Sequence, residues 1–151
     1  MTKQEFLDLC DRVFKKYGFV KHRKHYYLDM GSDLVGSIIF QGSAFGKGYY
    51  LEGSFSYKDK NEYLPYPTLT EIDLGQRIYV QGKEPIGGSC EYMTTLIKYE
   101  LYAAEEIEES IEQALTSWIM PAIQYGQTYI WAHEDLYKDL LCEARVLGKI
   151  K

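Results

Sequence analysis

The chain has 151 residues, a formal net charge of −5 and an ordinary balance of hydrophobic and charged residues. Its length suits one domain spanning residues 1–151, and its composition is that of a soluble globular protein. The acidic balance argues against nucleic acid as the main partner, because phosphate binding requires a basic surface. The amino-terminal sequence lacks an apolar signal segment, and no run approaches the ~18 apolar residues of a membrane helix. We therefore expect a cytoplasmic protein with no membrane association.

The first element is predicted to be a helix that begins after Thr2. Thr2 and Glu5 have the spacing of a capping box, in which each side chain accepts a hydrogen bond from the backbone amide of the other residue. Apolar residues recur at helical spacing as far as Tyr17, and Gly18 can end the helix in the left-handed conformation.

Three strands of an antiparallel meander are predicted between residues 19 and 57. Residues 19–30 and 34–41 are rich in aromatic or β-branched side chains, and a Gly-Ser-Asp turn separates them. The second of these strands is expected to be covered on both faces near Ile38, Ile39 and Phe40. Residues 49–57 alternate between apolar and mostly polar side chains, which is typical of a strand with one buried face and one solvent face.

The remainder of the chain is predicted to form a long loop over 58–71, a short strand over 76–80 and two helices. Residues 91–101 alternate as a strand would, although a helix is also possible. A helix from Ala103 should end or kink at Pro121, and the last helix spans about 132–147. The predicted fold class is α+β: an amino-terminal helix, an antiparallel meander sheet of four or five strands, and two carboxy-terminal helices packed on one sheet face.

The three cysteines, Cys10, Cys90 and Cys142, are odd in number and far apart in the sequence. No CxxC pair is present, so the sequence supports neither a disulfide framework nor a zinc ribbon. Cys10 falls on an apolar helical stripe and Cys142 adjoins two leucines, so both are expected to be structural. Cys90 lies in a glycine-rich segment and is expected to be exposed.

Two segments invite a phosphate-binding interpretation. The loop GSAFGKG at 42–48 is not a P-loop, because too few residues separate its glycines, no hydroxyl follows Lys47, and a strand follows in place of a helix. The basic run Lys21–His25 could hold phosphates or an acidic partner, and its two histidines would add charge below about pH 6.5. Alternatively, it is a solvated edge strand whose charges prevent pairing with another chain.

Four glutamates form the clearest candidate surface. They fall on one face of the helix that begins near Ala103, opposite its apolar stripe: Glu105, Glu108, Glu109 and Glu112. The face is either a solvated outer surface or a docking face for a basic protein partner. No histidine accompanies the glutamates and no calcium-loop spacing is present, so no metal site is expected.

The chain contains only three histidines and no nucleophile motif such as GxSxG. We therefore predict no catalytic residue and no cofactor. A Cys–His pair that meets only in space stays open, since such partners need not be close in sequence.

Several short motifs resemble the bacterial "domain of unknown function 4304" family. They are Tyr17–Phe19 after an amphipathic helix, the pair Tyr26-Tyr27, and Ile39–Ser43 before a glycine loop and an aromatic strand. Arg77 and Met120-Pro121 stand where later family motifs would fall. The resemblance implies no established activity. Small bacterial proteins of this kind often resemble immunity or other partner-binding proteins of toxin systems.

The leading hypothesis is therefore a non-catalytic protein-binding domain, of the immunity type, that docks a basic protein on the glutamate face. The alternative is a small-molecule-binding protein or enzyme with a pocket at the sheet end near Gln41, Ser43 and Arg77. Gln41 and Ser43 also have a structural interpretation, because both can bond backbone groups at a glycine turn. Nucleic-acid binding through Lys21–Lys24 is the weakest hypothesis.

Overall fold

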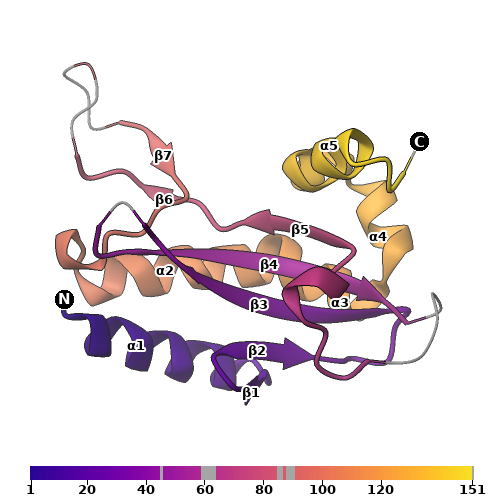
Figure 1. Ribbon diagram of the computed structural model, residues 1–151, viewed down its shortest axis with the longest axis horizontal. Helices are drawn as coiled ribbons and strands as arrows, with labels where there is room; N and C mark the ends of the chain where they lie inside the picture. Colours follow the sequence, from indigo (N-terminus) through magenta and orange to yellow (C-terminus); the bar gives the residue numbers. More distant parts are fainter. Residues whose placement is uncertain (45, 59–63, 85–86, 88–90, 151) are drawn as a thin grey trace.

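The computed structural model describes residues 1–44, 46–58, 64–84, 87 and 91–150, and it has the predicted α+β architecture (Figure 1). Short 3₁₀ or π-helical turns are labelled η. The elements in chain order are α1 (Lys3–Lys16), β1 (Val20–His22), β2 (His25–Leu28), β3 (Leu34–Gly42), β4 (Tyr49–Tyr57), η1 (Leu69–Glu71), β5 (Leu74–Arg77), β6 (Val80–Gln81), β7 (Met93–Thr94), η2 (Tyr99–Leu101), α2 (Ala104–Ala114), η3 (Leu115–Ile119), α3 (Met120–Tyr125), α4 (Gln127–Ala132), η4 (Glu134–Tyr137) and α5 (Lys138–Val146).

The predicted meander is confirmed as a five-stranded antiparallel sheet in the order β1-β2-β3-β4-β5. The two long central strands, β3 and β4, pair along their whole length. β6 and β7 form a separate two-stranded ladder that extends away from the sheet (Figure 1).

Helix α1 has the predicted capping box. The amide of Glu5 donates to Thr2 Oγ1 at 3.1 Å, and the amide of Thr2 donates to Glu5 Oε1 at 3.2 Å. Gly18 follows the helix with a φ of 95°, as expected for a residue that turns the chain in the left-handed conformation. The buried stripe of α1, which includes Cys10, faces the sheet.

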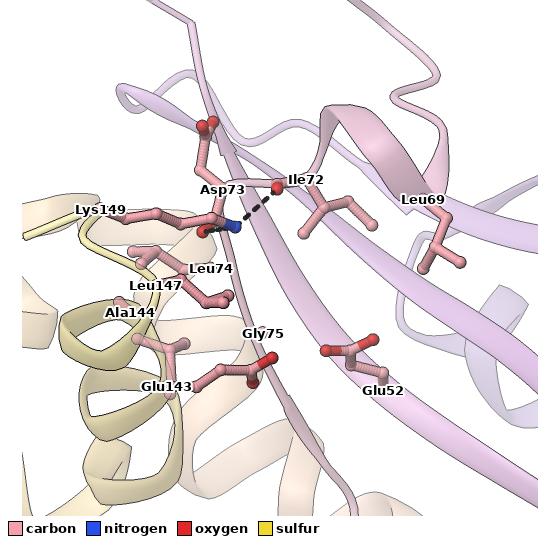
Figure 2. Close-up of a pocket in the computed structure, with 11 residues that line it drawn as sticks. Glu52, Leu69, Ile72, Asp73, Leu74, Gly75, Glu143, Ala144, Leu147 and Lys149 are labelled. Atoms are coloured by element: carbon pink, nitrogen blue, oxygen red, sulfur yellow. Dashed lines mark hydrogen bonds between the residues drawn. The ribbon is translucent and has the colours of Figure 1, made fainter.

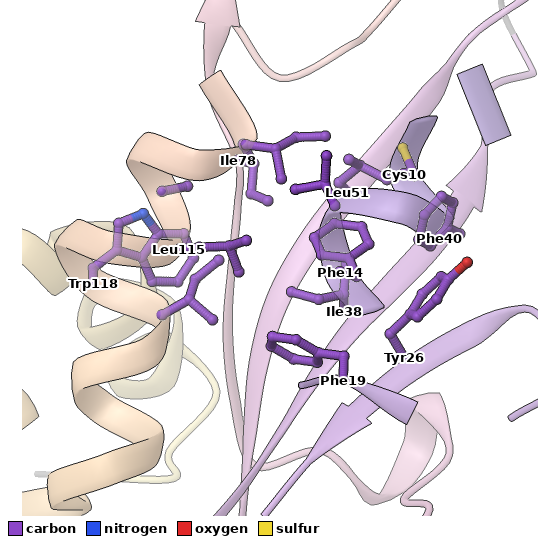
Figure 3. Packing of buried hydrophobic residues seen from close by; sticks show 14 of the residues in the cluster. Cys10, Phe14, Phe19, Tyr26, Ile38, Phe40, Leu51, Ile78, Leu115 and Trp118 are labelled. Atoms are coloured by element: carbon purple, nitrogen blue, oxygen red, sulfur yellow. The ribbon is translucent and has the colours of Figure 1, made fainter. Parts of the chain in front are cut away.

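The main core lies between one face of the sheet and a layer formed by α1 and by the continuous helix α2–η3–α3. Figure 3 shows side chains of both layers in this core. Two glycines let the helices approach closely: an added Cβ would lie 2.6 Å from Trp118 Cη2 at Gly53 and 2.2 Å from Ile123 Cδ1 at Gly36. The absence of side chains at these two strand positions therefore sets the spacing between the layers.

The opposite face of the sheet is also covered, which the alternation of residues 49–57 did not predict. Ser54 and Ser56 are buried, because the segment 64–73 with its turn η1 crosses this face (Figure 1). The hydroxyl of Tyr27 donates to the carbonyl of Pro67 at 3.1 Å and ties the segment to β2. Ser37, on β3, is fully buried beside Ser54.

The strand predicted over 19–30 is in fact a hairpin, β1–β2. Arg23 and Lys24 form its turn, and Arg23 has a φ of 58°. The sequence has no glycine or asparagine at this turn, so the usual hairpin signal is missing. The predicted strand over 76–80 is displaced, because β5 ends at Arg77 and Val80 begins the separate ladder.

The strand predicted over 91–101 is wrong for most of that range. Only Met93 and Thr94 form a strand, and Tyr99–Leu101 form the turn η2. Ile97 makes a single bridge to Tyr49. Ile97 and Tyr99 are buried, whereas Met93 and Leu101 are exposed, so the alternation does not correspond to a continuous ladder with one buried face.

The helix through Pro121 does not end there. The π-helical turn η3 precedes the proline, and the amide of Met120 donates to the carbonyl of Leu115, five residues back. A wider turn changes the hydrogen-bond pattern, so the missing proline amide is tolerated and the helix continues to Tyr125.

The single helix predicted over 132–147 is divided into η4 and α5, with α4 ending at Ala132. Gly126, with a φ of 81°, opens α4, and Asp33 accepts hydrogen bonds from the backbone and side chain of Gln127 at 3.0 and 3.1 Å. Leu136 and Leu147 are exposed, whereas Tyr137 is fully buried.

Helix α5 lies beside β5, where the Gln76 side chain donates to the carbonyl of Leu136 and accepts from the amide of Leu140. Cys142 is exposed and was wrongly predicted to be structural, since Leu140 and Leu141 occupy the inward positions. Cys10 is buried, as predicted. Cys90 lies outside the described residues.

Gly53→Ala is expected to destabilise the fold by about 1–3 kcal/mol, because the new methyl group would collide with the rigid indole ring of Trp118. Denaturant unfolding measures this change. Gly42→Ala is the matched control, since nothing lies within 4 Å of its added Cβ. Equal stability of the two variants would show that the layers can separate without cost.

Candidate functional site

The four glutamates of the predicted docking face line one shallow hollow on α2. Their spacing places them on one side of the helix, away from the buried residues Ile107 and Ile111. The hollow has a volume of about 630 Å³ and is completed by Tyr17, Gln113 and Thr116. The structure therefore brings together Glu105, Glu108, Glu109 and Glu112.

Two of these glutamates are paired with bases of α1. Arg12 Nη1 lies 2.9 Å from Glu108 Oε1, and Lys16 Nζ lies 2.9 Å from Glu112 Oε1. These hydrogen bonds raise the pKa of Arg12 and of Lys16. The charge of half the glutamate face is therefore balanced within the chain.

Glu105 and Glu109 are exposed, and within the part of the chain that the structure describes neither makes a hydrogen bond or an ion pair. Their negative charge is available to a partner in solution. Across the described ranges, no group of three or more His, Cys, Asp or Glu side chains is arranged to hold a metal ion.

Gln41 and Arg77 lie at the same end and on the same face of the sheet, on either side of Tyr50. Gln41 pairs with Tyr50 between β3 and β4, and Arg77 pairs with Glu52 between β4 and β5. The guanidinium carbon of Arg77 lies 3.8 Å from the centre of the Tyr50 ring, a cation–π contact.

Ser43 lies beyond the end of β3, where its backbone amide donates to the carbonyl of Gly48 at 3.0 Å. Gln41, Ser43 and Arg77 do not line the hollow on α2, the hollow that contains Glu52 and Glu143, or the hollow at the β1–β2 hairpin. The structure thus places Gln41 and Arg77 on either side of one tyrosine, and it places Ser43 in the adjoining loop.

The covered second face of the sheet contains three buried hydroxyls that lack a hydrogen-bond partner among the described residues: Ser37, Ser54 and Ser56. Ser37 and Ser54 are directly opposite one another in the register of β3 and β4. Buried hydroxyls of this kind are commonly satisfied by ordered water. This part of the sheet is therefore suited to internal water beneath the segment 64–73.

Two carboxylates meet at the edge of this face. Figure 2 shows Glu52 of β4 and Glu143 of α5 pointing toward one another across β5 at Gly75, in a hollow of about 150 Å³. Lys149, in the same hollow, donates to the carbonyls of Ile72 and Asp73 at 3.4 and 3.0 Å. The hollow is smaller than the sites that usually hold small molecules.

The position of Glu52 depends on Gly75, which pairs with Ser54 between β4 and β5. A Cβ added to Gly75 would lie 2.4 Å from Glu52 Oε1 and 3.0 Å from Ser54 Oγ. Burial raises the pKa of Glu52, and the charge of Glu143 raises it further, while Arg77 has the opposite effect. The ionised form of Glu52 is therefore disfavoured in the folded protein.

Sequence reasoning missed this second face because Glu52, Ser54 and Ser56 alternate with apolar residues, as solvent-facing positions do. The available signal lay in the loop predicted over 58–71, since it contains apolar residues. Leu69 of this loop and Ile72, which directly follows it, line the hollow beside Glu52.

Glu52→Gln is expected to raise the melting temperature at pH 7 and to have little effect below pH 4. The pKa of Glu52 is raised on folding, so the folded state binds more protons above the unfolded pKa, and stability falls as the pH rises through that window. Thermal unfolding against pH measures the effect. Glu143→Gln should also stabilise the protein, and the double variant should gain less than the sum, because the repulsion is shared. Additive gains would contradict the proximity of the two carboxylates.

Among the described residues, no helix combines the length and the apolar character required to cross a membrane. No curated protein and no solved structure matches the chain. The model of the family described as domain of unknown function (DUF4304) matches residues 10–125, from within α1 to the end of α3. This span includes the five-stranded sheet and the glutamate face. Because the match covers more than half of its length, the chain belongs to the DUF4304 family.

Proposed function

We propose that this chain is a non-catalytic protein-binding domain of the immunity type, which acts in the bacterial cytoplasm and docks a basic protein on the glutamate face of α2. The observation that supports this most directly is the single hollow lined by four glutamates, of which only Glu108 and Glu112 are paired with bases of α1. Complementary charge increases the rate of association and selects among partners. Tyr17, at the rim of the same hollow, adds an amphipathic ring of the kind enriched at protein interfaces.

The non-catalytic part of the proposal is supported by the surroundings of the buried thiol. Cys10 lies in the main core, and burial raises the pKa of its thiol. A thiol held in its protonated form is a poor nucleophile. His133 Nδ1 lies 2.9 Å from the carbonyl of Tyr129, a contact within its own helical segment.

The charge-reversal variant Glu105→Lys/Glu109→Lys tests the docking face. The partner is first captured from the lysate of the source cell and identified, and its affinity is then measured by calorimetry. The variant is expected to weaken binding at least about tenfold, because the two unpaired charges are reversed. Raising the salt concentration should weaken binding to the unaltered protein more than binding to the variant.

Glu134→Lys/Asp135→Lys is the charge control, since it makes the same change of charge on η4, away from α2, and it also removes the contact of Glu134 with Arg145 at 3.6 Å. All variants should keep the far-ultraviolet circular dichroism spectrum of the unaltered protein. An affinity that falls equally in the control and in the α2 variant would mean that net charge matters and that the glutamate face is the wrong surface.

A small-molecule site at the sheet end is the second candidate function. The observation that favours it is the Arg77 guanidinium held over Tyr50, beside Gln41, which presents a fixed cation at one end of the sheet. Such a site would select a small anion. A thermal-shift screen of anionic metabolites should then yield a ligand whose stabilising effect is lost in Arg77→Met. A ligand that stabilises this variant equally would bind elsewhere.

A further inference from the structure

The hairpin β1–β2 and the segment 66–69 enclose a hollow of about 530 Å³ on the second face of the sheet. This volume lies within the range of small-molecule sites. The hollow differs in chemistry from the glutamate face, because no carboxylate lines it. It is lined by His22, Arg23, Lys24, His25, Tyr27, Tyr66, Thr68 and Leu69.

The cationic part of the hollow is the hairpin turn. Arg23 and Lys24 are exposed, and neither makes a hydrogen bond or an ion pair with the rest of the described chain. Glu71 follows on the same crossing segment, but its Oε1 accepts hydrogen bonds from the amide and hydroxyl of Thr68. Two permanent positive charges therefore stand free in a chain whose net charge is negative.

The backbone of Arg23 supports a role for its side chain. Its φ of 58° is the only positive value among the described residues other than glycine. A bulky residue is disfavoured in this region, where glycine or asparagine is usual. Residues in strained backbone conformations are concentrated at ligand-binding and active sites. The conformation of Arg23 is therefore consistent with a binding role for its side chain.

The opposite wall of the hollow is aromatic. The rings of His22 and Tyr66 are stacked, with centroids 4.1 Å apart and an interplanar angle of 2°. Tyr27 meets Tyr66 edge-on at 5.3 Å, and its hydroxyl holds the carbonyl of Pro67. Each of the two stacked rings covers one face of the other, so another planar ring can stack on an outer face of the pair.

His25 contributes a defined hydrogen-bond donor. Its Nδ1 accepts the amide proton of Phe40 at 3.0 Å, so the neutral ring carries its proton on Nε2. Burial lowers the pKa of His25, which favours this neutral form. The lining therefore combines two cations, a neutral N–H donor and a stacked aromatic wall.

We propose that this hollow binds a free nucleoside monophosphate, with the phosphate at Arg23 and Lys24 and the base against the wall formed by His22 and Tyr66. Arginine and lysine are the side chains that proteins use for phosphate, and base stacking on aromatic rings is common to nucleotide sites. A polymer is a poorer match, because single-stranded nucleic acids follow a basic groove over several nucleotides. The proposal is independent of the docking of a protein on α2.

Calorimetric titration with adenosine monophosphate tests the proposal, with adenosine, inorganic phosphate and an oligothymidylate as comparison probes. The monophosphate is expected to bind more tightly than adenosine or phosphate, since it uses both parts of the hollow. Arg23→Asn should weaken binding about tenfold or more while leaving the melting temperature equal or higher, because asparagine suits the positive φ. Tyr66→Leu should weaken binding of the monophosphate and leave the weak binding of phosphate unchanged.

Lys138→Asn is the control, because it removes one positive charge at the start of α5, beside the far edge of the sheet. Its affinity for the monophosphate should equal that of the unaltered protein. The proposal is overturned if the monophosphate does not bind at millimolar concentration, or if Arg23→Asn and Tyr66→Leu bind it normally. Tighter binding of the oligothymidylate, with steep salt dependence, would also overturn it in favour of a single-stranded nucleic acid.

Discussion

The close contact of Trp118 and Ile123 with the sheet sets the distance between the two layers of the core. Gly53 and Gly36 present bare backbone at the two contact points, so a ring and a branched side chain rest directly on β4 and β3. This contact closes the core face with one helical layer. The opposite face is left to a single crossing segment, and the hollows of that face lie at the margins of this segment.

The amino-terminal segment is rich in basic residues and α2 is rich in glutamates. The packing of α1 against α2 pairs part of each group with the other. Arg12 and Lys16 balance two glutamates of α2. What remains for solution is a basic hairpin at one edge of the sheet and an acidic hollow on the helical layer. A net charge of −5 conceals this separation, because the sum says nothing about position.

Local signals were sufficient for much of the fold, because they depend on neighbours in the sequence. The capping box at Thr2 is one example, and the alternation of residues 49–57 correctly bounded β4. Distant partners could not be foreseen. Ser54 is buried by a segment after the strand, and Glu108 meets an arginine 96 residues away. The glutamate face could be recognised because one helix carries all of it, whereas the hollow at Arg23 requires the hairpin β1–β2 and the distant segment 66–69.

The π-helical turn η3 changes the direction in which the later side chains of the long helix point. Each residue of an α-helix advances the side-chain direction by about 100°, so a stripe that repeats at every fourth position drifts around the axis. The wider turn takes up one additional residue and resets this drift between Ile111 and Ile123. Both residues are therefore fully buried against the same sheet, although a regular helix of the same length would turn Ile123 toward the side of the layer. The widened turn thus rotates the later side chains back toward the sheet, so the helix contacts the sheet both before and after the turn.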